Sequence, residues 1–258
     1  MSNAISHLYL SQTRISIHLE PDSISQLKSV EVMYLNGCNF VGSNLGLLGN
    51  LTQLIELRLA GNQFGGQIPF SFGKLKHLEY LDLKYNNFIG PIPDVFVNQT
   101  QLAWLDLSDN SFQGHLPFSL RNLKQLSHLL LSSNNFTGKI LNEFSNLTQL
   151  TKVDLSNNRF DGQILSSIKN LNMLNFLKLS YNDFSGKISD SFLNLTQLTD
   201  LDLSNNRFDG LISSSLGNLN MLLSLRLSFN NFSGKIPNGF ANLTQLTWLD
   251  LSNNKFDG

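Results

Sequence analysis

The stretch Leu105-Asp106-Leu107-Ser108-Asp109-Asn110-Ser111-Phe112 holds the pattern that decides the fold. Its asparagine recurs along the chain at one constant spacing, and a phenylalanine stands two positions after each copy. The nine asparagines are Asn62, Asn86, Asn110, Asn134, Asn158, Asn182, Asn206, Asn230 and Asn254. Nine copies in one phase indicate a repeat architecture, in which no unit can bury its apolar face alone and each must stack on its neighbours.

Each part of the unit has a physical role. The two leucines alternate with an outward residue, which predicts a short strand with period 2. The asparagine amide is predicted to satisfy backbone groups of neighbouring turns, and the phenylalanine to fill the core beneath. Cys38 precedes Asn62 by the same spacing. We therefore interpret it as a buried member of the asparagine column rather than as a reactive or metal-bound thiol.

The pattern L-x-x-L-x-L-x-x-N/C is the leucine-rich repeat signature. It predicts an α/β solenoid, a right-handed superhelix with a parallel β-sheet on the concave face and about 11 turns of 24 residues. We expect one continuous solenoid domain: residues 1–26 as a degenerate first repeat, 27–242 as nine full repeats, and 243–258 as a truncated last repeat. A short helical turn is expected on the convex side of each repeat.

Composition excludes several classes of protein. The net charge of -1 comes from scattered lysines and arginines, so there is no basic surface for nucleic acid. No stretch of about 18 apolar residues is present, which leaves no membrane segment in this chain. Residues 1–20 contain polar and charged side chains throughout, so they do not resemble a secretory signal. The five histidines share no repeat column, and we expect no enzyme, no metal and no cofactor.

The full consensus is L-x-x-L-x-x-L-x-L-S-x-N-x-F-x-G-x-I-P, and residues 242–258 carry it as far as its glycine. It resembles the plant extracellular subclass of leucine-rich repeats, and in particular ectodomains of plant receptor-like proteins of the disease-resistance type. The resemblance implies a location at the extracellular face of the plasma membrane or in the apoplast. It also implies a peptide or protein ligand and a receptor-kinase co-receptor.

The chain departs from that family pattern in two ways. The proline is replaced in five turns, by Leu45, Leu141, Leu165, Ser189 and Ser213, which we expect to loosen the second strand of those turns. The family's cysteine-containing caps, signal peptide and membrane helix do not appear. We therefore interpret the chain as a receptor fragment or a truncated gene product.

The outward residues of the predicted strands supply the candidate ligand site. Tyr80, Trp104 and His128 fall on neighbouring strands and should form an aromatic strip about 10 Å long. Asp82, Tyr85 and Asp106 flank it, and Phe176, Lys178 and Tyr181 form a second patch. Exposed aromatics beside charges are typical of binding hot spots, although such residues can also simply cover a sheet.

Seven N-x-S/T triplets are candidate glycosylation sites: Asn50, Asn98, Asn135, Asn146, Asn194, Asn231 and Asn242. About five such triplets would arise by chance in a chain this rich in asparagine, serine and threonine, so they fit secretion without proving it.

The leading hypothesis is a ligand-recognition ectodomain fragment that binds a peptide or protein on its concave face, in defence or developmental signalling. One alternative is a secreted inhibitor of a pathogen wall-degrading enzyme, similar to the polygalacturonase inhibitors. A second alternative is a non-signalling truncated scaffold.

Overall fold

The computed structural model describes residues 5–13, 26–42, 45–140, 144, 146–164 and 166–257. The chain divides into two compact units, Met1–Asn135 and Phe136–Gly258, and each is described by itself. The expectations for Leu141 and Leu165 lie outside the described residues, as does most of the degenerate first repeat. The single continuous domain expected from the repeat remains a prediction.

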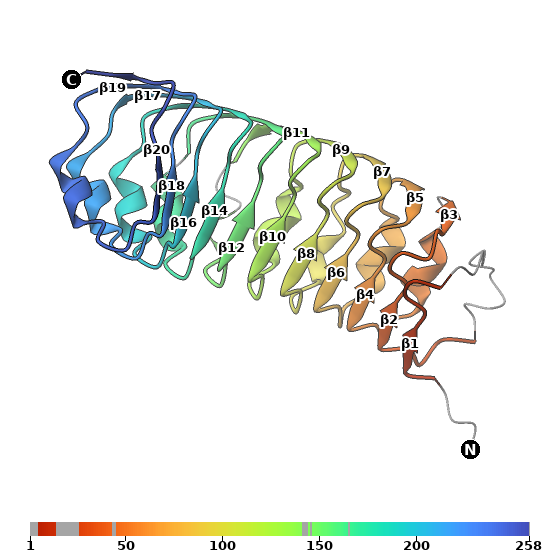
Figure 1. Cartoon of the computed structure of the whole chain (residues 1–258). Helices are drawn as coiled ribbons and strands as arrows, with labels where there is room; N and C mark the ends of the chain where they lie inside the picture. Colours follow the sequence, from red (N-terminus) through yellow and green to blue (C-terminus); the bar gives the residue numbers. More distant parts are fainter. Residues whose placement is uncertain are drawn as a thin grey trace. The chain divides into compact units, whose positions relative to one another are not determined.

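The first sheet of each unit is built from the short L-x-L strands, all parallel and one per turn (Figure 1). Neighbouring strands pair in register, so equivalent residues of consecutive turns lie opposite one another, as in Tyr80 beside Trp104. In the N-terminal unit the strands are β1 (His7–Tyr9), β2 (Val32–Tyr34), β4 (Glu56–Arg58), β6 (Tyr80–Asp82), β8 (Trp104–Asp106) and β10 (His128–Leu130). In the C-terminal unit they are β12 (Lys152–Asp154), β14 (Phe176–Lys178), β16 (Asp200–Asp202), β18 (Ser224–Arg226) and β20 (Trp248–Asp250).

A second set of strands follows each asparagine, at the N-x-F-x-G part of the repeat. The N-terminal unit contains β3 (Val41–Gly42), β5 (Gln63–Gly66), β7 (Asn87–Gly90) and β9 (Ser111–Gly114). The strand β11 (Asn135–Lys139) begins at the last residue of that unit. The C-terminal unit continues with β13 (Arg159–Gly162), β15 (Asp183–Gly186), β17 (Arg207–Leu211), β19 (Asn231–Gly234) and β21 (Lys255–Phe256).

The helical part of each described turn is a 3₁₀ helix rather than an α-helix. These segments are three to six residues long, a length at which the tighter i to i+3 pattern is common. They are η1 (Leu45–Asn50), η2 (Phe70–Lys74), η3 (Phe96–Asn98), η4 (Phe118–Asn122), η6 (Ser166–Asn170), η7 (Asp190–Asn194), η8 (Ser214–Asn218) and η9 (Asn238–Asn242).

Loss of the proline does not shorten the second strand in the two serine turns: β15 precedes Ser189 and has four residues, β17 precedes Ser213 and has five, and β19 precedes Pro237 and has four. The strand β3, which precedes Leu45, has only two residues, so the expected loosening stays a prediction. Ser213 adopts φ -67° and ψ 139°, close to the φ -65° and ψ 135° of Pro237. Serine therefore reaches the same extended conformation that proline imposes.

The core consists of leucine and phenylalanine columns. The strand leucines are buried, for example Leu57 and Leu59 at 0% exposure. The phenylalanine rings stack turn upon turn, with centroids 5.7 Å apart for Phe88 and Phe112 and 6.1 Å apart for Phe160 and Phe184. Much of the apolar surface of each turn is therefore buried against the neighbouring turns, which stabilises the stack.

The asparagine column joins consecutive turns by side-chain hydrogen bonds. Asn62 Oδ1 accepts from the backbone amides of Cys38 and Phe40, both at 3.0 Å, and its Nδ2 donates to the carbonyls of Leu35 and Leu59 at 2.7 and 2.9 Å. The same pattern recurs down to Asn254. Cys38 is a buried free thiol in this column, and its Sγ donates to the carbonyl of Leu10 at 2.8 Å.

Candidate ligand-binding face

The three residues of the aromatic strip lie at the first positions of β6, β8 and β10. The ring centroids of Tyr80 and Trp104 are 5.0 Å apart with planes 14° from parallel, and those of Trp104 and His128 are 4.0 Å apart at 19°. Both faces of the Trp104 indole are therefore covered by neighbouring rings. The strip therefore presents ring edges and polar tips, rather than open ring faces, on this side of the sheet.

The stack extends to residues that sequence reasoning missed. The Arg58 guanidinium carbon lies 4.1 Å from the Tyr80 ring centroid and 4.5 Å from that of Tyr34. Glu56 accepts hydrogen bonds from Arg58 Nη2, at 3.1 Å, and from the Tyr34 hydroxyl. Such cation–π contacts contribute about 0.5–1 kcal/mol each at exposed sites. We call Tyr34, Arg58, Tyr80, Trp104 and His128 the stacked column.

The signal for this extension was present in the sequence. Tyr34 and Arg58 hold the same position in consecutive repeats, so the repeat phase places the two side chains on adjacent strands. Their contact with Tyr80 is less apparent, because Arg58 and Tyr80 occupy different outward columns of the sheet.

Two donors in the stacked column lack partners. Trp104 Nε1 and Arg58 Nε are buried and have no hydrogen-bond partner among the described residues. A buried donor left in this state costs about 1–3 kcal/mol. Burial also raises the pKa of Tyr80 to about 12, so its hydroxyl keeps its proton and can donate. The stacked column therefore contains two buried donors without a partner among the described residues, and a Tyr80 hydroxyl that can donate.

Asp82 and Asp106 are less accessible than the sequence reasoning assumed, since their side chains turn back onto the chain. They are only 5% and 3% exposed. Asp82 Oδ1 accepts from the Lys84 amide at 3.1 Å, and Asp106 Oδ1 accepts from the amide and hydroxyl of Ser108 at 3.1 and 2.6 Å. Both carboxyls therefore stabilise the turn that follows their strand.

The environment of these carboxyls decides the direction of their pKa shifts. Burial raises the pKa of Asp82 to about 6 and raises that of Asp106. Asp250 makes the same serine contact, with Ser252 Oγ donating to it at 2.7 Å, but it is only partly buried. There, hydrogen bonds from Ser252 and Ser228 lower its pKa.

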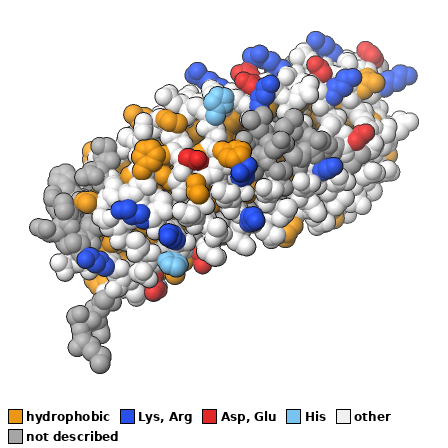
Figure 2. Space-filling view, turned by 180° about the vertical axis from the view of Figure 1, so that it is seen from behind, with side chains coloured by type: hydrophobic (Ala, Val, Ile, Leu, Met, Phe, Trp, Pro, Cys, Tyr) orange, Lys and Arg blue, Asp and Glu red, His pale blue; other side chains and the backbone are white. Residues whose placement is uncertain are grey.

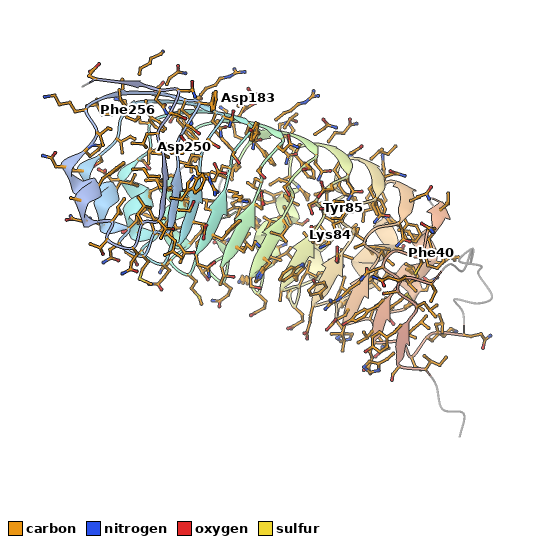
Figure 3. All side chains as sticks on the ribbon, in the orientation of Figure 1. Phe40, Lys84, Tyr85, Asp183, Asp250 and Phe256 are labelled. Carbon is orange, nitrogen blue, oxygen red and sulfur yellow. The ribbon has the colours of Figure 1, made fainter. Side chains whose placement is uncertain are left out.

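Tyr85 and Tyr181 lie in the turns after β6 and β14, next to the first sheet but beyond its strands. Figure 3 marks Tyr85 beside Lys84 in the first of these turns. Both tyrosines have left-handed backbones, with φ 52° and 55°, and are 59% and 60% exposed. Bulky residues rarely adopt this conformation. Phe229 is a third aromatic residue at this position, whereas the other turns hold small or polar residues such as Gly61 and Asn205.

In the C-terminal unit, the second patch centres on Phe176. The Nζ atoms of Lys152 and Lys178 lie 4.6 and 5.1 Å from its ring centroid. Lys152 was not among the predicted site residues, although it neighbours Phe176 in register. Two strands further on, Arg226 pairs with Asp202 at 4.0 Å. The charges of this sheet face therefore partly neutralise one another.

A further exposed apolar set lies off the first sheet of the N-terminal unit and was not predicted. Phe70 is 78% exposed, Ile89 52% and Phe118 57%. The guanidinium carbon of Arg121 lies 3.5 Å from the Phe118 centroid. Figure 2, the view from behind, shows exposed hydrophobic side chains among the polar ones on the surface of this unit.

Neither a metal centre nor a membrane helix is found in the parts of the chain that the structure describes. No group of three or more His, Cys, Asp or Glu side chains there is placed to hold a metal ion. None of the described helices is long and apolar enough to cross a membrane.

Comparisons with known proteins agree with this geometry. A model of the leucine-rich repeat region matches residues 10–164, and further leucine-rich repeat models match residues 173–195 and 196–256. A 66-residue segment is 36% identical to pollen receptor-like kinase 2 of Arabidopsis thaliana, covering 26% of this chain and 10% of that protein.

Two solved plant receptors are similar over nearly the whole chain. A crystal structure of PEPR1–AtPEP1 has a TM-score of 0.93 and 33% identity, covering 99% of this chain and 36% of the other. The plant peptide hormone receptor RGFR1 in complex with RGF2 has a TM-score of 0.80 and 31% identity, covering 96% and 47%. This chain thus spans a tenth of the curated relative and less than half of these receptors.

Parallel strands stacked one per turn, with a hydrogen-bonded asparagine in each, define a leucine-rich repeat solenoid. The chain belongs to the leucine-rich repeat family. Its relatives and structural neighbours identify it as a plant-type leucine-rich repeat receptor-like ectodomain.

Proposed function

We propose that this chain is the ligand-recognition part of a plant receptor, and that it binds an extended peptide or a protein segment along the first sheet. The repeat predicts this face to be the concave one. The observation that carries the proposal is the stacked column, whose rings are ordered before a ligand arrives. The Tyr80 hydroxyl keeps its proton, so it can donate to one of the carbonyl acceptors that a peptide supplies along its length.

Preorganisation favours binding of this kind. A ligand loses little free energy in ordering rings that already stack on one another, so more of the contact energy appears as affinity. Structural neighbours that are peptide receptors support the same ligand class. We extend the proposal to an extracellular location and a receptor-kinase co-receptor, in defence or developmental signalling.

The test uses a display library of random linear peptides, selected on the full chain. We expect the selected peptides to lose about 30-fold or more in affinity for Trp104→Ala, which corresponds to about 2 kcal/mol and a hot-spot residue. The matched control is Phe118→Ala, which removes an exposed aromatic ring away from the first sheet.

Equal affinity of selected peptides for wild type and Trp104→Ala would remove the stacked column from the proposal. A library that yields no binder at all would favour the scaffold or the enzyme-inhibitor alternative. Binding that is lost in both variants would indicate a site on the helical side instead.

A further inference from the structure

Two exposed phenylalanines stand at one position of the repeat on the helical side of the N-terminal unit. Phe70 begins η2 and is 78% exposed, and Phe118 begins η4 and is 57% exposed. They are two turns apart, which places them about 10 Å from one another. Val97, in the turn between them, is 50% exposed. We call Phe70, Val97 and Phe118 the helical-side patch.

The fold does not require aromatic rings at the position of Phe70 and Phe118. The turns of the C-terminal unit form the same short helices with polar residues there, namely Ser166, Asp190, Ser214 and Asn238. The core uses other positions of the turn, such as that of Phe72, which is 1% exposed. Exposed rings add little to packing and reduce solubility, so a patch of them indicates a surface that is covered in use.

Basic side chains surround the helical-side patch. The segments 70–76, 94–100 and 118–124 contain four cations and one acid, Asp94, so their net charge is 4 − 1 = +3. The cations are Lys74, Lys76, Arg121 and Lys124, and all four are exposed. None of them has a carboxylate within 4.0 Å among the residues that the structure describes. Figure 2 shows Lys and Arg side chains close to the hydrophobic ones on this face.

The arrangement of Arg121 and Asp94 leaves the positive charge available to a partner. The guanidinium carbon of Arg121 lies 3.5 Å from the Phe118 ring centroid, so the side chain stacks on an aromatic face. A guanidinium held in this way still presents N–H donors in its plane, which suits a phosphate group. Asp94 Oδ1 instead accepts from the Ser119 amide at 2.9 Å, at the start of η4.

We propose that the helical-side patch binds the surface of a lipid bilayer that contains anionic lipids. The two rings enter the boundary between headgroups and acyl chains, and the four cations contact lipid phosphates and carboxylates. Stable attachment to a bilayer takes two signals, and this face combines apolar side chains with a basic surround. Charge complementarity therefore selects an anionic surface as the partner.

The protruding rings favour a bilayer over a protein partner. A bilayer is fluid and yields to side chains that project from the surface, whereas a protein partner needs a hollow that matches them. The stacked column belongs to the first sheet and the patch to the helices, so a bilayer on the patch leaves the proposed peptide site open. The inference does not depend on the proposed function.

The test is sedimentation of the full chain with vesicles of phosphatidylcholine and phosphatidylserine. We expect partitioning onto these vesicles, and a loss of about tenfold or more in the double variant Phe70→Ser/Phe118→Ser. Ser166 and Ser214 hold the same position, so the variant should fold and unfold in urea as wild type does. The matched control is Tyr85→Ser, which removes an exposed ring outside the patch at the position of Ser133 and should bind normally.

A charge variant tests the basic surround separately. Lys74→Gln/Lys124→Gln should reduce partitioning onto the mixed vesicles about tenfold, since each cation near an anionic surface contributes about 1 kcal/mol. Partitioning of wild type should also fall with added salt and be weaker on vesicles of phosphatidylcholine alone.

A fluorescent reporter tests which side of the unit enters the bilayer. The two native tryptophans, Trp104 and Trp248, lie on the first sheet. Phe118→Trp should therefore gain fluorescence that vesicles with brominated acyl chains quench, whereas Tyr85→Trp should gain fluorescence that they do not quench.

Wild-type protein that stays in solution with the mixed vesicles would overturn the proposal, and so would equal partitioning of the double serine variant. Wild-type dimers that dissociate in that variant without any vesicle binding, measured by light scattering, would show that a second copy covers the patch instead. Peptide selection uses the first sheet, so these results leave the test of the proposed function unchanged.

Discussion

At the scale of single residues, the same repeat position has different chemistry according to its burial. Asp106 and Asp250 both accept from a serine two positions later. Burial nevertheless raises the pKa of Asp106, while hydrogen bonds lower that of Asp250. The repeat position of an aspartate therefore predicts which groups it contacts, but not whether its carboxyl is buried or exposed to solvent.

Asp82 gives a residue-scale prediction. Its pKa in the folded protein is about 6, against an ordinary 3.8, and the cause is burial. The raised pKa means that the protonated form is the one that favours folding. That stability is present below about pH 4 and is lost as the pH rises through about 6. At about 1.4 kcal/mol per pKa unit, the loss is at most about 3 kcal/mol.

Asp82→Asn removes this titration and retains an oxygen for the Lys84 amide. We expect the free energy of unfolding of the variant, relative to wild type, to rise by up to about 3 kcal/mol between pH 4 and pH 7. Urea titrations at several pH values measure this difference. Asp209→Asn, an exposed change on β17, is the control. A wild-type-to-variant difference that stays constant with pH would contradict the prediction.

At the scale of the structural element, the repeat accepts serine at the proline position of its consensus. The backbone keeps the same conformation there, because each turn packs against its neighbours. The segments around Ser189 and Pro117 both begin a 3₁₀ helix, from ψ values of 159° and 143°. Proline there acts mainly on the unfolded chain, whose freedom it reduces.

Ser189→Pro follows from this view. Ser189 has φ -78°, which proline can adopt, and its buried hydroxyl has no hydrogen-bond partner among the described residues. We expect the substitution to raise the free energy of unfolding by about 0.5–1 kcal/mol, measured by urea titration. Ser189→Ala removes only the hydroxyl and should give a smaller gain. Destabilisation by proline alone would show that the Ser189 backbone needs freedom the folded geometry does not reveal.

Sequence reasoning performs well for features that repeat and poorly for features that combine columns. The period gives the strand positions, the Phe88 column and the hydrogen-bonded Asn86, because each depends on one position of the turn. The place of Arg58 between two rings depends on side-chain rotamers of three strands, which leave no periodic signal. The bond from a carboxyl to its own turn does recur, as at Asp82 and Asp106, but the sequence column does not show how deeply each carboxyl is buried.

At the scale of the whole molecule, stability should be a sum of contacts between consecutive turns, since each turn bonds only its neighbours. Asn86 is one such link. Its Nδ2 donates to the carbonyls of Leu59, Leu83 and Lys84 at 2.9, 3.0 and 3.1 Å, and its Oδ1 accepts from the Phe64 amide at 3.1 Å. Asn86→Ala leaves these groups unpaired, at about 1–3 kcal/mol for each one that stays buried.

We expect Asn86→Ala to speed hydrogen exchange of backbone amides in the turns around Phe64 and Phe88 by tenfold or more, since about 1.4 kcal/mol of local opening energy is a factor of ten. Amides in the turns around Phe208 should change little, because the link lies in the other unit. Asn87→Ala, the exposed neighbour on β7, is the matched control and should leave exchange nearly unchanged. Equal acceleration in both units would mean that the solenoid opens as one cooperative body, and that its turns are coupled far beyond the hydrogen bonds of the asparagine column.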